Sequence, residues 1–133
     1  MKVSEVKQLL DAAVDVGLSH MDFEVKTACG SDLMSDVLAF VKEQGILLTG
    51  LVNPQVLRTA EMMDIRVICF VRGKQPNADM VAMAQQKDMV LLHTQKPMFV
   101  ACGILYSAGL VPGEDAGRVP VTCAADGGAA EHE

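Results

Sequence analysis

The sequence has few aromatic side chains, no close cysteine pair and no cluster of basic residues. It contains no Trp, one Tyr and four Phe, so the core must be built from aliphatic side chains and Met. None of the four cysteines lies in a C-x-x-C pair, and no His stands at a ligand-like spacing from them. We therefore expect no zinc or iron–sulfur site, and no other cofactor or metal. Because no Lys/Arg stripe is present, we expect no nucleic-acid partner.

Long apolar runs are absent as well. No segment approaches the roughly 18 apolar residues of a membrane span. The opening stretch MKVSEVKQLL is charged and then amphipathic, unlike the apolar core of a signal peptide. The sequence thus predicts a cytoplasmic protein that makes no contact with a membrane.

What is present indicates one compact domain followed by a tail. A chain of 133 residues buries enough surface to fold without disulfides or metals. Residues 1–110 hold 12 acids and 10 bases, a net charge of −2, whereas residues 111–133 hold 5 acids and one Arg, a net charge of −4. We expect an α/β domain over 1–110 and a mobile Gly/Ala/acidic tail over 111–133. Half of the residues are hydrophobic, which favours a homodimer that covers apolar surface.

Helix, strand and turn patterns alternate along the first 110 residues. Asn53 and Pro54 fit the cap and first turn of a helix, and the β-branched run over 66–71 fits a central strand buried on both faces. The pattern predicts a layered α/β sandwich whose mostly parallel central sheet has about four to five strands flanked by helices. Predicted helices cover 3–14, 33–42, 54–64, 80–84 and 97–108. Predicted strands cover 23–27, 46–49, 66–71 and 90–92. Residues 119–123 are compatible with a short edge strand, but the pattern does not decide whether they form one.

Ligands of open α/β sheets bind at the carboxyl ends of the strands. In this sequence those ends carry small, polar or charged residues that form the candidate ligand-binding set: Gly30, Ser31, Asp32, Thr49, Gly50, Asn53, Arg58, Arg72, Gly73, His93 and Thr94. We expect no catalytic residue among them.

The stretch LLTGLVNPQV admits two interpretations. Its Thr49-Gly50 turn can present backbone N–H groups to an anion at the start of the following helix, or it can be a tight turn whose helix Asn53 caps. Arg58 and Arg72 can bind phosphate through two parallel hydrogen bonds, or they can lie solvated at the surface.

Two further motifs also admit alternatives. In the repeat Ser31-Asp32-x-x-Ser35-Asp36 the first pair can cap a helix, or Asp32 and Asp36 can share a face and hold a metal or a ribose. His93 ends a strand and can act as a base or as a structural or ligand-contacting side chain. No Ser or Cys nucleophile and no acidic partner can be assigned to it.

Several motifs in order resemble the DRTGG domain family, with a match over about residues 1–110. They are SDLMSDVL, a strand ending in TG, an N-P helix start, a strand into RGKQP, and a strand into HT before M-F-x-x-x-G-x-L-Y. The resemblance is to the small stand-alone members. After Thr49-Gly50, Leu51 and Val52 stand where the family has an Asp-Arg pair, and Arg72 stands in place of a second Gly.

The resemblance implies an α/β fold similar to the N-terminal domain of HPr kinase/phosphorylase. It also implies a regulatory or assembly module, often dimeric, like those beside CBS domains in some pyrophosphatases and in some phosphotransacetylases. Three hypotheses follow. The first is a non-catalytic, homodimeric module that senses a small anion such as an adenine nucleotide. The second is an interaction domain that binds a partner enzyme or regulator without a ligand. The third is a small phosphate-ester hydrolase or phosphotransferase that uses His93 and Asp32.

Overall fold

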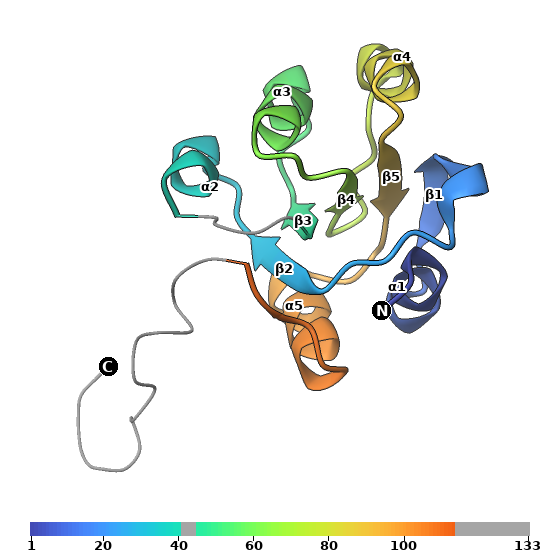
Figure 1. Cartoon of the computed structure of the whole chain (residues 1–133), viewed down its shortest axis with the longest axis vertical. Coiled ribbons are helices and arrows are strands. Elements are labelled where there is room, and N and C mark those ends of the chain that lie inside the picture. Colours follow the sequence, from blue (N-terminus) through green and yellow to red (C-terminus); the bar gives the residue numbers. More distant parts are fainter. Residues whose placement is uncertain (41–44, 114–133) are drawn as a thin grey trace.

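The computed structural model describes residues 1–40 and 45–113. Within them, five α-helices and a short 3-10 helix, η1, accompany a six-stranded sheet of order β1-β5-β4-β3-β2-β6 (Figure 1). All neighbouring strands are parallel except β1, which pairs antiparallel with β5. The elements are α1 (Val3–Leu10), β1 (Ala13–Val16), η1 (Leu18–His20), β2 (Thr27–Gly30), α2 (Met34–Phe40), β3 (Ile46–Thr49), α3 (Pro54–Met62), β4 (Val67–Phe70), α4 (Ala78–Gln86), β5 (Val90–His93), α5 (Met98–Ser107) and β6 (Val111–Pro112).

The sheet is covered on both faces, which confirms the predicted layered α/β sandwich. Helices α2, α3 and α4 lie on one face, and α1 and α5 lie on the other (Figure 1). Successive residues of a strand point to opposite faces, so Leu47 belongs to the first core whereas Ile46 and Leu48 belong to the second. Strand β4 is buried throughout, as its apolar sequence predicts.

The middle of the chain agrees closely with the sequence pattern. Strand β3 has the predicted bounds, and Asn53 accepts a hydrogen bond from Gln55 N at 2.8 Å to cap α3. Pro54 occupies the first turn, where its missing N–H leaves no intrahelical bond unmade. Helix α4 is capped in the same way by Asn77, whose Oδ1 accepts from Met80 N.

The amino-terminal prediction was wrong in two places. The first helix ends at Leu10, because Asp11 adopts a left-handed backbone (φ 50°) and the Ala12 amide turns back to Lys7 O. Val14, which was assigned to that helix, lies in the edge strand β1. The strand predicted over 23–27 begins at Thr27 instead and is β2.

The carboxyl-terminal residues that are described extend the sheet. Val111 and Pro112 form β6, which pairs parallel with β2 at its edge. With β1, this strand raises the sheet beyond the four to five strands expected. Residues 114–133, with the edge strand considered over 119–123, lie outside the described residues. In the part of the chain that is described, no helix is long and apolar enough to cross a membrane.

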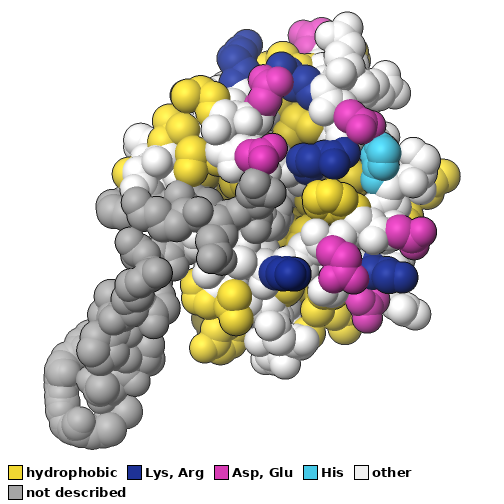
Figure 2. Space-filling model, in the orientation of Figure 1, with side chains coloured by type: hydrophobic (Ala, Val, Ile, Leu, Met, Phe, Trp, Pro, Cys, Tyr) yellow, Lys and Arg dark blue, Asp and Glu magenta, His cyan; other side chains and the backbone are white. Residues whose placement is uncertain are grey.

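Charge is spread unevenly over the surface. Figure 2 shows charged side chains over the upper and right-hand parts of one face, and hydrophobic side chains gathered at its lower left. That lower region is where Figure 1 draws α5 and β6.

Candidate functional site

The structure brings the candidate residues of four strands to one edge of the sheet. Strands β2 to β5 are parallel, and the ladder continues just beyond them: Ser31 N donates to Leu48 O at 3.0 Å, and Thr94 N donates to Phe70 O at 2.8 Å. The strand ends that carry the candidate residues therefore meet at one edge as a set of neighbouring loops, while ligand binding there stays a prediction.

The Asp32 carboxylate lies against the turn after β3. Its Oδ1 accepts from Gly50 N at 2.6 Å and from Thr49 Oγ1 at 3.1 Å. The same Thr49 hydroxyl accepts from Leu51 N at 3.1 Å. The Gly50 and Leu51 N–H groups are thus bonded within the chain, and the carboxylate lies where an external anion was considered. Asp32 itself is exposed, and its Oδ2 bonds none of the described residues.

Residues around this turn have structural partners or face solvent. Ser31 closes a local turn with Leu33, whose N–H donates to the Ser31 hydroxyl at 3.1 Å. Arg58 and Asp36 are exposed on α3 and α2. Among the described residues, no three His, Cys, Asp or Glu side chains gather as a metal site would require.

The loop after β4 has an unusual backbone. Arg72 and Gly73 have φ values of 60° and 74°, and Lys74 N donates to Val71 O at 3.1 Å. Two successive positive φ angles inside such a turn define type I′. The Arg72 and Gly73 amides donate to Lys96 O and Thr94 O, which fixes this loop beside the one after β5, with the Arg72 side chain exposed.

The residues after β5 bind to the amino-terminal part of the chain. The Thr94 hydroxyl is buried and donates to Leu10 O at 2.6 Å. His93 Nδ1 lies 2.8 Å from Asp15 Oδ2. Asp15 is the acidic partner that the sequence could not assign, because residues up to Val14 followed a helical spacing and concealed β1.

Two of the cysteines, Cys69 and Cys102, are poorly suited to nucleophilic chemistry. Burial, with the nearby Asp15 and Cys102, raises the pKa of the Cys69 thiol to about 12. Burial also raises the pKa of Cys102. Because the thiolate is the reactive form, both side chains are protonated and unreactive at neutral pH. Cys69 is fully buried in β4, where it packs as a small apolar side chain of the core.

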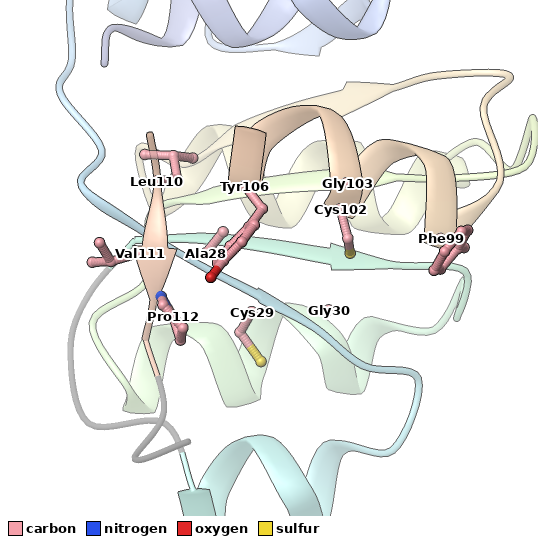
Figure 3. Close-up of a pocket in the computed structure, with 10 residues that line it drawn as sticks. All are labelled: Ala28, Cys29, Gly30, Phe99, Cys102, Gly103, Tyr106, Leu110, Val111 and Pro112. Carbon is pink, nitrogen blue, oxygen red and sulfur yellow. The ribbon is translucent and has the colours of Figure 1, made fainter. Parts of the chain in front are cut away.

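An apolar pocket of about 300 Å³ lies between α5, β2 and β6 (Figure 3). Gly30 permits the close packing of α5 on β2, because a Cβ there would lie 2.7 Å from Cys102 Sγ. Phe99 and Tyr106 are highly exposed at the pocket. The sequence predicted the helix over 97–108 but did not predict which of its apolar residues face outward. The lining residues are Ala28, Cys29, Gly30, Phe99, Cys102, Gly103, Tyr106, Leu110, Val111 and Pro112.

No protein-family model and no curated protein matches the sequence. Among solved structures, the chain is similar to the CBS and DRTGG domains of the regulatory region of Clostridium perfringens pyrophosphatase, complexed with the activator diadenosine tetraphosphate. The TM-score is 0.66 at 13% identity, over 84% of this chain and 47% of that one. The chain thus spans about half the length of that structure. The likeness shows a related fold, as the sequence resemblance predicted, while membership of the DRTGG family stays a prediction.

Proposed function

We propose that this chain is a non-catalytic regulatory module that binds a small ligand, with an adenine nucleotide as first candidate, at the carboxyl edge of the sheet. It acts through a second copy of itself or a partner protein. The observation that carries the proposal is the carboxylate of the exposed Asp32, whose Oδ1 accepts from Thr49 and Gly50. The solved structure of similar fold is that of a regulatory region complexed with a nucleotide activator, which supports the same class of function.

The geometry favours a ribose, rather than a phosphate, beside Asp32. A carboxylate accepts hydrogen bonds and repels anions, so the hydroxyl groups of a nucleoside suit Oδ2. Phosphate groups accept hydrogen bonds from a guanidinium, which Arg72 can supply from the loop after β4 and Arg58 from the exposed side of α3. Ligand binding would act by favouring one of two arrangements of the module and its partner.

An interaction domain without a ligand is the second candidate. It is favoured by the internal bonding of the Gly50 and Leu51 amides, because these two N–H groups are then not available to an external anion. An enzyme ranks last, because Cys69 and Cys102 are protonated and no described nucleophile bonds His93.

The test is thermal unfolding of the full chain with adenine nucleotides, dinucleotides, acetyl phosphate and coenzyme A. A ligand at 100 times its Kd adds about 2.7 kcal/mol of stability, which raises the midpoint by several degrees. We expect a nucleotide to give such a shift in the wild type and Asp32→Ala to abolish it. The control is Asp79→Ala, which removes an exposed first-turn acid from α4.

A shift that is lost in Asp32→Ala but kept in Asp79→Ala would support the nucleotide module. No shift from any compound at millimolar concentration would favour the interaction domain. A shift that both variants keep would place the ligand elsewhere.

A further inference from the structure

Helix α5 is apolar on its outer side as well as on its inner side. Its sequence, MFVACGILYS, has no charged residue. Ala101 and Leu105 are fully buried against the sheet, yet Phe99 is 89% exposed and Tyr106 is 70% exposed. A helix that covers a sheet and faces water normally carries polar side chains outside. The outer side of α5 therefore has the composition of a covered surface.

This outer face combines protruding side chains with hollows. We define the α5 outer face as Phe99, Val100, Gly103, Tyr106 and Ser107, all of them exposed. The pocket of about 300 Å³ flanks it on the β6 side, and a second, shallow and open apolar depression flanks it on the α1 side. Phe99 and Gly103 line both, and Figure 3 shows where they lie at the first of the two.

A second copy of this chain fits that face better than an unrelated surface does. In a two-fold contact the same patch occurs on both partners, so it must contain both a projection and a hollow to receive it. The α5 outer face contains both. Residues 1–110 carry a net charge of only −2, so long-range repulsion between two copies of the domain is weak. One of the hydrophobic groups on the face in Figure 2 lies in the lower region, where Figure 1 draws α5.

The exposed apolar area of the α5 outer face is a substantial part of what a stable dimer interface buries. At about 200 Å² for a full aromatic side chain, Phe99 and Tyr106 together offer roughly 300 Å². A standard interface buries about 800 Å² on each partner. The two aromatic rings would thus supply more than a third of that area. Further exposed apolar residues border them: Leu9, Val100 and Val111.

Gly103 gives a second, independent reason. It lies inside a helix, where Gly is less stable than Ala by about 0.5–1 kcal/mol. No described atom lies within 4 Å of a Cβ built there, so packing within the chain does not require a glycine. A helix from a second copy crossing at this position would require it, because two backbones approach closely where no side chain intervenes.

We infer that two copies of this chain associate through the α5 outer face, with Phe99 of each entering the pocket beside α5 of the other. This inference rests on the proposed function, in which the module acts through a second copy of itself or a partner protein. It identifies the second copy as the partner and the α5 outer face as the contact surface.

The test is sedimentation equilibrium of the full chain without ligand, from about 1 to 100 µM. We expect a dimer. We expect Phe99→Glu to raise the dimer Kd at least roughly a hundredfold, because both copies in a two-fold contact carry the substitution and two charges are buried. The matched control is Met62→Glu, which places the same charge at a 73% exposed hydrophobic position on α3, across the sheet. Circular dichroism of Phe99→Glu verifies its fold, and an exposed position should leave that fold intact.

A dimer that Phe99→Glu dissociates and Met62→Glu leaves intact would support the inference. A monomeric wild type would overturn it and would leave the face to residues 114–133 or to a different protein. A dimer insensitive to Phe99→Glu would overturn it as well. Because no ligand is added, a failure here leaves the thermal-shift test at Asp32 unaffected.

Discussion

Arg72 shows how a single backbone angle can conflict with its side chain. Its φ of 60° lies in the left-handed region, where a Cβ clashes with the following carbonyl at a cost of about 1–2 kcal/mol. The surrounding loop holds it there, because its amide donates to Lys96 O at 2.8 Å. The exposed guanidinium makes no hydrogen bond or ion pair with a described residue. A functional side chain is one reason to retain an arginine at a position that suits glycine.

Replacement of Arg72 separates backbone strain from side-chain function. We expect Arg72→Gly to be more stable than Arg72→Ala by about 1 kcal/mol, because only glycine removes the strain. Urea unfolding of both variants measures the difference. Equal stabilities would mean that the loop relaxes and that the left-handed angle costs nothing.

At the residue scale, the sequence predicted which side chains reach the edge but not how they pair. Thr49, Asp32 and His93 were all identified. The bonds of Asp32 to Gly50 and of His93 to Asp15 span 18 and 78 residues along the chain, so local patterns carry no trace of them. Asp15 in particular depends on β1 lying beside β5.

The two Asn-capped helices make a matched pair at the scale of elements. Asn53 and Asn77 both accept a backbone hydrogen bond at the start of a nine-residue helix, α3 and α4 respectively. Only Asn53 belongs to the candidate ligand set. We expect Asn53→Ala and Asn77→Ala each to lower the free energy of unfolding by about 1 kcal/mol, because each loses its cap.

Ligand binding should distinguish the two variants. If Asn53 also contacts the ligand, Asn53→Ala reduces the ligand-induced rise in unfolding temperature more than Asn77→Ala does. Comparison of both variants with and without the nucleotide measures this. Equal rises would assign Asn53 to capping alone.

Elements in the middle of the chain were predictable because each has a strong local pattern. Strand β3 is a short apolar run between Gly45 and Gly50, and α3 begins with Asn-Pro. The edge strands β1 and β6 were not predictable, because their sheet partners, β5 and β2, are distant in sequence. Helix α5 was predicted from the sequence, but its exposed side was not. An apolar helix has no polar stripe to mark the side that faces solvent.

At the scale of the whole molecule, the buried sulfur of Cys69 couples folding to alkaline pH. The thiol lies fully buried in β4, and burial raises its pKa from 9.0 to about 12 in the folded chain. Below pH 9 the thiol is protonated in both states, so its contribution to stability is constant. Between pH 9 and 12 the unfolded chain releases this proton first, so stability falls as pH rises.

The expected slope is about 1.4 kcal/mol of unfolding free energy per pH unit above pH 9. Urea unfolding at pH 8, 9, 10 and 10.5 measures it, and Cys69→Ala provides the reference for all other groups that titrate in this range. The variant loses stability at every pH because it leaves a small void, but its curve should be flatter above pH 9. Wild-type and variant curves that stay parallel through pH 10.5 would show that the thiol ionises in the folded chain, and that the core around β4 admits water.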